Sequence, residues 1–369
     1  MQTSKPFYIV GLSGGVDSSA TALLLLEKGA RVEGIFMKNW VDVHGDENCT
    51  AMDDMDDARQ VAEKLDIPFD TVNFAPEYWD RVFTHFLDEY RAGRTPNPDI
   101  LCNREIKFDL FLKLALEKGA DKIATGHYAR VTEENGLFQL RKAREQSKDQ
   151  TYFLYTLGQA QLKHSLFPLG DIEHKKTVRE MAETAKLVTH DKKDSTGICF
   201  IGEKNFTEFL GHYLPAQPGN IVTSDNQTIG QHQGLMYYTL GQRKGLGIGG
   251  SSNASELPWF VVGKRLAENE LVVAQGTNHP LLLSTELLAE QLHWVSGKAP
   301  KSGSKLKAKT RYRQPDQDCT IEFNDTRTVR VNFDEQQRAV TPGQSVVFYD
   351  GEICLGGGII QSVDGIIYG

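Results

Sequence analysis

A glycine-rich loop near the N-terminus carries the first residues that could do chemistry. Residues 11–19 read Gly-Leu-Ser-Gly-Gly-Val-Asp-Ser-Ser and separate an apolar, β-rich run from a helical pattern. Glycines let a backbone approach a polyanion closely, and the amides and dipole of a helix N-terminus favour negative charge. The loop lacks the Lys-Ser/Thr of a Walker A loop and does not fit GxGxxG. We interpret it as a phosphate site, the alternative being a turn that only packs a helix on a sheet.

Two cysteines lie among turn-forming residues. Cys102 follows the two prolines of Thr95-Pro-Asn-Pro-Asp-Ile-Leu-Cys, which stiffen the chain and fix the direction of Asp99. Arg104 and Lys107 are close enough in sequence to favour the thiolate form of Cys102. Cys199 lies in Asp-Ser-Thr-Gly-Ile-Cys, again with lysines nearby. Spacing alone leaves a reactive role and an inert role equally open for each thiol.

The other three cysteines have no such setting. Cys319 and Cys354 fall in strand-like runs and are expected to be small core or surface residues, and Cys49 is undecided. The chain has neither a CxxC motif nor a Cys/His cluster at zinc spacing, so we expect no structural metal site.

Composition and charge narrow the class of protein. A chain of 369 residues, 40% hydrophobic and 24% charged, predicts two or three soluble domains. No apolar run approaches the roughly 18 residues of a membrane span, and the N-terminus does not read as a signal peptide. We therefore expect a cytoplasmic protein that does not associate with membranes.

A basic stretch interrupts this acidic chain. The net charge is -8, yet residues 298–313 hold seven Lys/Arg and no acids. On a single strand, alternation would place five of these side chains on one face. We interpret that face as a contact for nucleic-acid phosphates, the alternative being a solvated strand face. The five residues are Lys305, Lys307, Lys309, Arg311 and Arg313.

The elements that position these residues follow from hydrophobic periodicity. Strand and helix patterns alternate up to about residue 205, which predicts an α/β fold with a doubly wound parallel sheet and ligands at the C-terminal strand ends. Within it we expect a loop at 91–104 that holds Cys102 and a helix at 107–118. Short strands then predominate, which predicts a small middle domain and a C-terminal β-barrel. The predicted domains are 1–208, 209–280 and 281–369.

The sequence Ser-Gly-Gly-Val-Asp-Ser resembles the SGGxDS signature of the PP-loop ATPases. The resemblance implies that the loop binds ATP, which family members typically cleave between the α and β phosphates to adenylate a substrate. It also implies Mg²⁺, which Asp17 would help to place. The implied nucleotide-binding residues are the loop and two strand-end positions: Gly11, Leu12, Ser13, Gly14, Gly15, Val16, Asp17, Ser18, Met37 and Gly126.

Six motifs, in order and spacing, are similar to those of the tRNA-specific 2-thiouridylases over essentially the whole chain: GLSGGVDSS, NPDILCNREIKF, ATGHYAR, KDQTYFL, DSTGICFIGE and LGQRKGLGIGG. The resemblance implies adenylation of the C2 oxygen of the wobble uridine in tRNAs for lysine, glutamate and glutamine. Sulfur would then come from a persulfide on Cys199, supplied by a sulfur-relay protein or a cysteine desulfurase. A transient Cys102–Cys199 disulfide would follow, and whether Cys102 also attacks C2 stays open. We expect a monomer.

The same resemblance implies a set of tRNA contacts. Asn97 and Asp99 would hold the target base, with Asp99 as a proton acceptor, and the base would leave the anticodon stack to reach them. The full set is Asn97, Pro98, Asp99, His127, Asp149, Gln150, Thr151, Arg311, Tyr312 and Gln344. Two other functions remain compatible with the loop: an amide synthetase, which would not need the two cysteines, and an ATP-binding RNA chaperone or regulator without chemistry.

Overall fold

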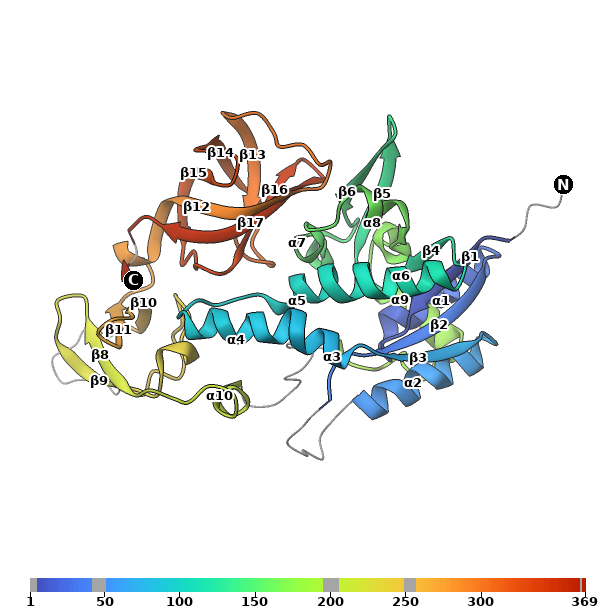
Figure 1. The fold of residues 1–369 in the computed structure, drawn as a ribbon, viewed down its shortest axis with the longest axis horizontal. Coiled ribbons are helices and arrows are strands. Elements are labelled where there is room, and N and C mark those ends of the chain that lie inside the picture. Colours follow the sequence, from blue (N-terminus) through green and yellow to red (C-terminus); the bar gives the residue numbers. More distant parts are fainter. Residues whose placement is uncertain (1–4, 42–50, 195–205, 249–256, 366) are drawn as a thin grey trace.

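Three sheets form the framework of the protein (Figure 1). The computed structural model describes residues 5–41, 51–194, 206–248, 257–365 and 367–369. A five-stranded parallel sheet comes first in the chain, a second five-stranded sheet lies in the middle region, and six C-terminal strands close into a barrel. The predicted fold class is therefore confirmed.

The parallel sheet has the strand order β3-β2-β1-β4-β7. Its strands are β1 (Phe7–Gly11), β2 (Arg31–Lys38), β3 (Phe69–Asn73), β4 (Lys122–Ala124) and β7 (Ser165–Leu166). The chain leaves β1 toward β2 and β3 on one side and returns to β4 and β7 on the other. The change of direction lies between β1 and β4, and open α/β sheets bind their ligands at the carboxyl ends of strands at such a point.

Helices cover both faces of this sheet because successive residues of β1 point to opposite sides. Val10 joins a cluster with α1 (Val16–Glu27) and α2 (Ala51–Lys64). Ile9 joins a larger cluster on the other face, under two helical segments. These segments comprise α3 (Ala75–Tyr78), η1 (Trp79–Phe83), α4 (Thr84–Arg91), α5 (Pro98–Leu101), η2 (Cys102–Phe111) and α6 (Leu112–Glu117), of which η1 and η2 are π-helical.

The second of these segments begins earlier than predicted. Helical structure starts at Pro98, so Cys102 lies on a helix and the predicted loop at 91–104 is wrong over its last residues. The Asn97 side chain caps the helix by accepting a hydrogen bond from the Asp99 amide at 3.2 Å. Pro98 occupies the first helical position, where its missing N–H has no partner to lose. The same Pro-Asn-Pro-Asp sequence that suggested a stiff loop is therefore a helix start.

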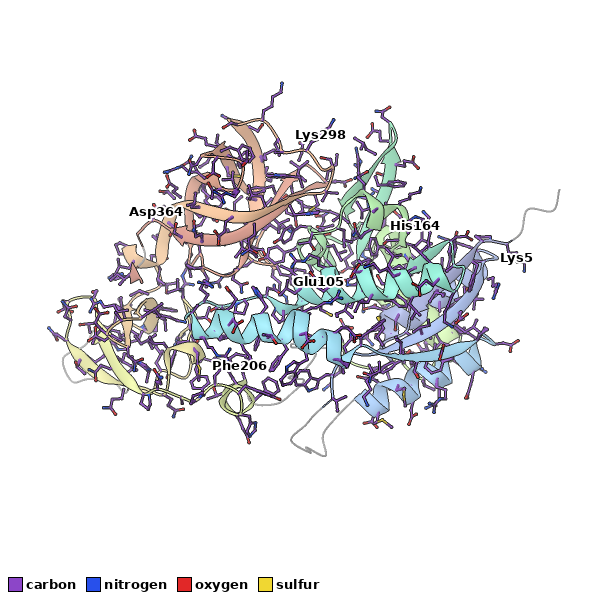
Figure 2. The ribbon with its side chains drawn as sticks, viewed as in Figure 1. Lys5, Glu105, His164, Phe206, Lys298 and Asp364 are labelled. Carbon is purple, nitrogen blue, oxygen red and sulfur yellow. The ribbon has the colours of Figure 1, made fainter. Side chains whose placement is uncertain are left out.

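The barrel and the middle sheet occupy the rest of the chain. The barrel strands are β12 (Leu283–Trp294), β13 (Ser304–Lys309), β14 (Gln317–Phe323), β15 (Val329–Arg338), β16 (Ser345–Asp350) and β17 (Ile353–Val363). The middle sheet contains β8 (Gly219–Thr223), β9 (Thr228–His232), β10 (Trp259–Arg265), β11 (Glu270–Gln275) and β18 (Ile367–Tyr368). Lys298, in the loop after β12, projects from the barrel into solvent (Figure 2).

Short helices connect these parts. They are η3 (Gln146–Lys148), α7 (Thr151–Leu154), α8 (Gln159–Lys163), η4 (Pro168–Asp171), α9 (Lys175–Thr184), α10 (Phe206–Gly211), η5 (Leu235–Tyr237) and η6 (Pro280–Leu282). Among them, α9 packs against α1 through Val178 and Ala182.

A hairpin from the N-terminal region extends the barrel sheet. It consists of β5 (Ala129–Glu134) and β6 (Leu137–Lys142), and β6 pairs antiparallel with β17. At the end of β6, Lys142 is 4% exposed, and its Nζ lies 2.5 Å from Asp316 Oδ2 and 4.3 Å from the centre of the Tyr349 ring. The hairpin therefore joins the parallel-sheet region to the barrel through backbone pairing and a largely buried ion pair.

The middle region meets the N-terminal region through a second buried lysine. Lys264 of β10 is 1% exposed and donates a hydrogen bond to the Gly93 carbonyl at 2.7 Å, just beyond the end of α4. Burial lowers the pKa of Lys264 to about 7. This ammonium is satisfied by a carbonyl at a helix end, where positive charge is favoured.

Replacing Lys142 tests the joint between hairpin and barrel. Lys142→Met keeps the apolar stem but leaves Asp316 without its closest partner. We expect a loss of about 2 kcal/mol, below the full range for buried pairs because Asp316 is partly exposed. That loss corresponds to a melting temperature about 4 to 8 °C lower in thermal denaturation. Lys113→Met, which removes an exposed pair with Asp109, is the control and should change the melting temperature little. Equal effects of the two substitutions would contradict a role for Lys142 at this joint.

Candidate functional site

The glycine loop joins β1 to α1 without any side chain capping the helix. Gly15 is the N-cap residue with extended backbone angles, so the first-turn amides are available to a ligand or water. Ser18 Oγ accepts a hydrogen bond from the Ser13 amide at 3.1 Å and donates one to the Gly15 carbonyl at 3.0 Å. Gly14 has φ +72°, and a Cβ there would lie 2.2 Å from the Asp54 carbonyl oxygen. The loop therefore requires glycine at position 14, and its serines hold its shape.

The two strand-end residues of the predicted nucleotide site lie on either side of this loop. A Cβ on Gly126, just after β4, would lie 2.8 Å from the Asp17 carbonyl carbon and 2.9 Å from the Ser18 amide nitrogen. On β2, the Met37 Cε lies 3.1 Å from the position of a Cβ on Gly11. Residues far apart in sequence thus gather at the carboxyl ends of three adjacent strands, where the fold places ligands.

Asp17, in the first turn of α1, is held by two groups from other elements. Its Oδ1 accepts hydrogen bonds from the Tyr128 hydroxyl at 2.9 Å and from Lys175 Nζ at 2.5 Å. Burial, and then the negative charge of Asp17, raise the pKa of Tyr128, so this hydroxyl stays a donor. Sequence analysis missed both partners, because they lie 111 and 158 residues away along the chain.

Asp99 and Cys102 lie three residues apart on one helical segment and therefore share a face. Cys102 is 2% exposed and belongs to the large core cluster. Burial raises the pKa of Asp99 above its ordinary value of 3.8, and the positive charge of Lys107 partly opposes the rise. Arg104 forms an ion pair with Glu105 at 2.8 Å. The second cysteine of interest, Cys199, lies outside the described residues.

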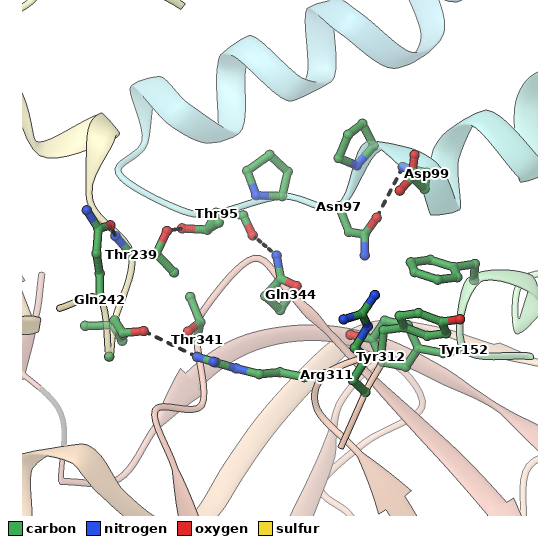
Figure 3. A pocket seen from close by; sticks show the side chains of 16 residues that line it. Thr95, Asn97, Asp99, Tyr152, Thr239, Gln242, Arg311, Tyr312, Thr341 and Gln344 are labelled. Atoms are coloured by element: carbon green, nitrogen blue, oxygen red, sulfur yellow. Dashed lines mark hydrogen bonds between the residues drawn. The ribbon is translucent and has the colours of Figure 1, made fainter. Parts of the chain in front are cut away.

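Asp99 lines a pocket of about 570 Å³ where the N-terminal, middle and barrel regions meet (Figure 3). The N-terminal region contributes residues 95–99, Tyr152 and Phe153, and the middle region contributes residues 239–242. The barrel side contributes residues 311–313 together with two positions from its later part. Six of the ten predicted tRNA contacts meet in this pocket: Asn97, Pro98, Asp99, Arg311, Tyr312 and Gln344.

Hydrogen bonds tie the three pocket walls together. Gln344 Nε2 donates to the Thr95 carbonyl at 2.6 Å, and the hydroxyls of Thr95 and Thr239 are 3.3 Å apart. Arg311 Nη2 donates to the Ala339 carbonyl at 2.7 Å and to the Leu240 carbonyl at 3.3 Å. These contacts mean that the pocket exists only when all three regions are assembled.

Sequence analysis also missed an aromatic pair in the pocket. The rings of Phe153 and Tyr312 have centroids 4.5 Å apart and are tilted by 45°. Asn103, next to Cys102, donates through Nδ2 to the Phe153 carbonyl at 3.1 Å. The pair of aromatic side chains is thus tied to the helix that carries Cys102. Tyr312 was a predicted tRNA contact and Phe153 lies in the KDQTYFL motif, but no local pattern indicated that the two rings meet.

The other four predicted tRNA contacts are not part of the pocket. His127 is 9% exposed, its Nδ1 lies 2.7 Å from Thr125 Oγ1, and its pKa is lowered, first by burial. Asp149 and Thr151 are buried and bonded to each other at 2.7 Å, and burial raises the pKa of Asp149. Gln150 is partly exposed, with its side-chain carbonyl accepting from the Tyr128 amide. In this structure Asp149, Gln150 and Thr151 bond to protein groups.

The basic strand differs from its prediction. Strand β13 ends at Lys309, and Arg311 and Arg313 lie in the turn that follows. Lys309 is only 8% exposed, with Nζ 3.7 Å from Asp316 Oδ1 and 5.5 Å from the centre of the Tyr349 ring. The expectation that all five bases share one exposed strand face is therefore wrong. Lys305 remains exposed, and Lys307 pairs with Asp318 at 2.7 Å on the surface.

Cys319 and Cys354 are buried in the barrel region, so of the two placements expected for them the structure has the core one. Burial raises the pKa of Cys319 to about 12 and raises that of Cys354 further, which disfavours the reactive thiolate. Within the described ranges, no three His, Cys, Asp or Glu side chains gather as a metal site would require. The same part of the chain contains no helix with the length and apolar character to cross a membrane. Cys49 is outside the described residues.

Comparison with known proteins gives matches along nearly the whole chain. Residues 8–203 match the model of a tRNA methyl transferase HUP domain, residues 207–275 that of a tRNA methyl transferase PRC-barrel domain, and residues 284–360 that of an aminomethyltransferase beta-barrel domain. A curated protein from Shewanella piezotolerans, named a tRNA-specific 2-thiouridylase, is 61% identical over 96% of this chain and 95% of its own. One of the same name from Shewanella oneidensis is 60% identical over 96% of both chains.

Adding one methyl group at Gly126 tests the nucleotide site. Gly126→Ala places a Cβ against the backbone of the first turn of α1, so the loop must shift. We expect the affinity for ATP, measured by calorimetric titration, to fall by at least about tenfold, equivalent to about 1.4 kcal/mol.

Gly158→Ala is the matched control, because the nearest neighbour of its Cβ would lie 3.4 Å away. It should leave the ATP affinity unchanged. Unchanged affinity in Gly126→Ala, with the protein folded, would show that ATP binds elsewhere.

Proposed function

Because the chain belongs to the family of tRNA-specific 2-thiouridylases, we propose that it uses ATP to replace the C2 oxygen of a tRNA uridine with sulfur. The observation that carries this function is the three-walled pocket, which holds Asp99 at its edge with Cys102 one helical turn further on. A thiol on the helix that lines a pocket of base-sized dimensions, in the same N-terminal region as an ATP loop, suits transfer of sulfur to an activated base.

The chemistry requires activation before substitution. The C2 carbonyl of uracil is urea-like and unreactive, and oxide is a poor leaving group. Attack of the C2 oxygen on the α phosphate of ATP releases pyrophosphate and forms an adenylated uridine. A sulfur nucleophile can then attack C2 and displace AMP. ATP use follows from the PP-loop motif, and the glycine loop supplies the amides and hydroxyls for the phosphates.

The sulfur is proposed to arrive as a persulfide on Cys199. Its terminal sulfur attacks C2 as AMP leaves, so that Cys199 becomes linked to the base through two sulfurs. The Cys102 thiolate then attacks the Cys199 sulfur, the bond between the two sulfurs breaks, and the electron pair stays on the sulfur attached to C2. The products are 2-thiouridine and a Cys102–Cys199 disulfide, which a thiol reductant must open. A direct first attack of Cys102 on C2 remains the alternative order.

The substrate assignment is the wobble uridine of tRNAs for lysine, glutamate and glutamine. Asn97, Pro98 and Asp99 are proposed to hold the flipped base, with the Phe153–Tyr312 rings as a stacking surface. Asp99 is the proposed proton acceptor, since a carboxyl of raised pKa accepts a proton more readily near neutral pH. Arg311 and Gln344 support the far wall. Outside the pocket, His127, Asp149, Gln150 and Thr151 remain proposed tRNA contacts, as the family resemblance implies.

Mg²⁺ is proposed to accompany ATP. Carboxylate oxygens suit this ion, and Asp17 presents one at the glycine loop. When bound, the ion would neutralise the phosphates and favour departure of pyrophosphate. The sulfur is proposed to come from a relay protein or a cysteine desulfurase, and the enzyme to act as a monomer in the cytoplasm.

Removing the proposed persulfide carrier tests the function. In a reaction with tRNA, ATP and a cysteine desulfurase with its cysteine substrate as the source of persulfide sulfur, Cys199→Ala should abolish 2-thiouridine in mass analysis of the nucleosides, while ATP affinity is retained. Cys102→Ala should also block product release. Cys319→Ala is the control and should retain activity, because that thiol lies on β14 of the barrel and does not line the pocket. If Cys199→Ala retained thiolation, the persulfide mechanism would be wrong. Wild type that forms neither AMP nor 2-thiouridine would instead favour a nucleotide-dependent RNA binder.

Asp99→Asn separates catalysis from stability. The raised folded pKa means that the fold favours the protonated form, so the charged carboxylate reduces stability as pH rises above its unfolded pKa. Asparagine removes this penalty, and the melting temperature at pH 7 should not fall. Thiolation should fall about 10²-fold, and the decline of the wild-type rate toward acid pH should vanish from the residual activity.

Asp109→Asn, on the same helical segment, serves as the control. It pairs with Arg81 and Lys113 away from the pocket, so thiolation should be retained. Equal losses of rate in both variants would mean that the rate depends on the integrity of the helix and not on the carboxylate of Asp99.

A further inference from the structure

The glycine loop contains no cation of its own. Residues 11–19 include neither lysine nor arginine, whereas a bound triphosphate carries several negative charges. Amides, hydroxyls and a helix dipole offset only part of this charge. A positive side chain from elsewhere in the fold is therefore needed near the first turn of α1.

Lys175 occupies that place. It is the first residue of α9, its side chain is 11% exposed, and its ammonium lies 2.5 Å from Asp17 Oδ1 and 3.1 Å from Asp194 Oδ1. It also lies 5.4 Å from the centre of the Tyr128 ring, whose hydroxyl binds the same Asp17 oxygen. Asp17 itself is the second residue of α1, so the ammonium stands beside the turn whose amides would receive phosphate.

Both carboxylates that pair with Lys175 also have other partners. Asp194 also pairs with Arg179 at 2.9 Å and with Lys148 at 3.0 Å. Asp17 retains the Tyr128 hydroxyl as a donor. If Lys175 turned toward a phosphate, each carboxylate would keep at least one partner, so the loss on moving is small. An ammonium has three donors, and two carboxylates occupy two of them.

We propose that Lys175 is the phosphate-binding lysine of the nucleotide site, supplied from α9 in place of the lysine that the loop lacks, with Asp194 as its counter-ion when no nucleotide is bound. This inference rests on the proposed use of ATP at the glycine loop. It assigns to Lys175 the neutralisation of the triphosphate and of the departing pyrophosphate.

Lys192 also lies in this part of the structure, and its geometry suits a different role. Its Nζ pairs with Asp54 at 2.7 Å and with Asp57, both on α2. Neither of these carboxylates bonds to the first turn of α1. Lys192 therefore fastens α2 to the segment after α9, whereas Lys175 contacts the loop itself.

The test compares ligands that differ only in phosphate content. Equilibrium affinities of the full-length protein for ATP, pyrophosphate and adenosine are measured by calorimetric titration for wild type, Lys175→Met, Lys175→Arg and Lys176→Met. Lys176 is the matched control, because it is adjacent on α9 but exposed and paired with Glu180. We expect Lys175→Met to weaken ATP and pyrophosphate at least about tenfold, to leave adenosine unchanged, and to be partly rescued by arginine. Lys176→Met should match wild type.

The outcomes distinguish the possible failures. An equal loss for ATP and adenosine in Lys175→Met would mean that the lysine only supports the shape of the loop, and would overturn the inference. Unchanged ATP affinity would overturn it too, while thiolation by the wild type would leave the proposed function standing. A wild type that binds no ATP and makes no 2-thiouridine would instead remove the proposed function itself.

Discussion

The pairing of β6 with β17 is the interaction on which the geometry of the site depends. The parallel sheet provides the ATP loop and the helix of Cys102, whereas the barrel provides Arg311, Tyr312 and Gln344. Main-chain hydrogen bonds between the two strands fix distance and register more tightly than side-chain contacts could. The Lys142–Asp316 pair and the Gln344–Thr95 bond then align the two walls of the pocket. Without this shared sheet edge, a pocket with three walls would have no fixed shape.

The helical segment that begins at Pro98 connects the pocket to the chemistry. Its first turn lines the pocket, its second carries Cys102, and its later turns pack on the parallel sheet that ends in the glycine loop. One rigid element therefore relates the base to the thiol, and one sheet relates the thiol to the nucleotide. Sites on helices and strands hold their groups more accurately than sites on loops. Burial of Asp99 in this segment weakens its acidity, which is the property that a proton acceptor needs.

Sequence patterns predicted the structure correctly wherever the structure is determined by neighbouring residues. Glycines between an apolar run and a helical pattern predicted β1, the loop and α1, because φ above zero at Gly14 and an uncapped helix start are local requirements. Alternating strands and helices predicted the parallel sheet. The Asn97–Pro98 helix start also had a local signal, which we read as a stiff loop because proline has both uses.

Contacts between distant segments could not be predicted in this way. Lys175 and Tyr128 reach Asp17 only because α9 and the end of β4 fold against α1. Lys309 is likewise buried beside the Tyr349 ring of β16, so strand alternation alone gave the wrong exposure. The roles of Asp149 and Thr151 stay predictions, since their buried hydrogen bonds describe how they are held and not what they recognise.

The shared sheet edge has a consequence for how the chain folds. Arg141 and Glu352, which meet beside it, are separated by 211 residues. During synthesis the outer edge of β6 therefore stays unpaired until the last barrel strands leave the ribosome. Exposed strand edges template the wrong partners, and contacts between distant residues form slowly. The nascent N-terminal region is thus the intermediate most exposed to misassembly, and chaperones would have most effect before barrel closure.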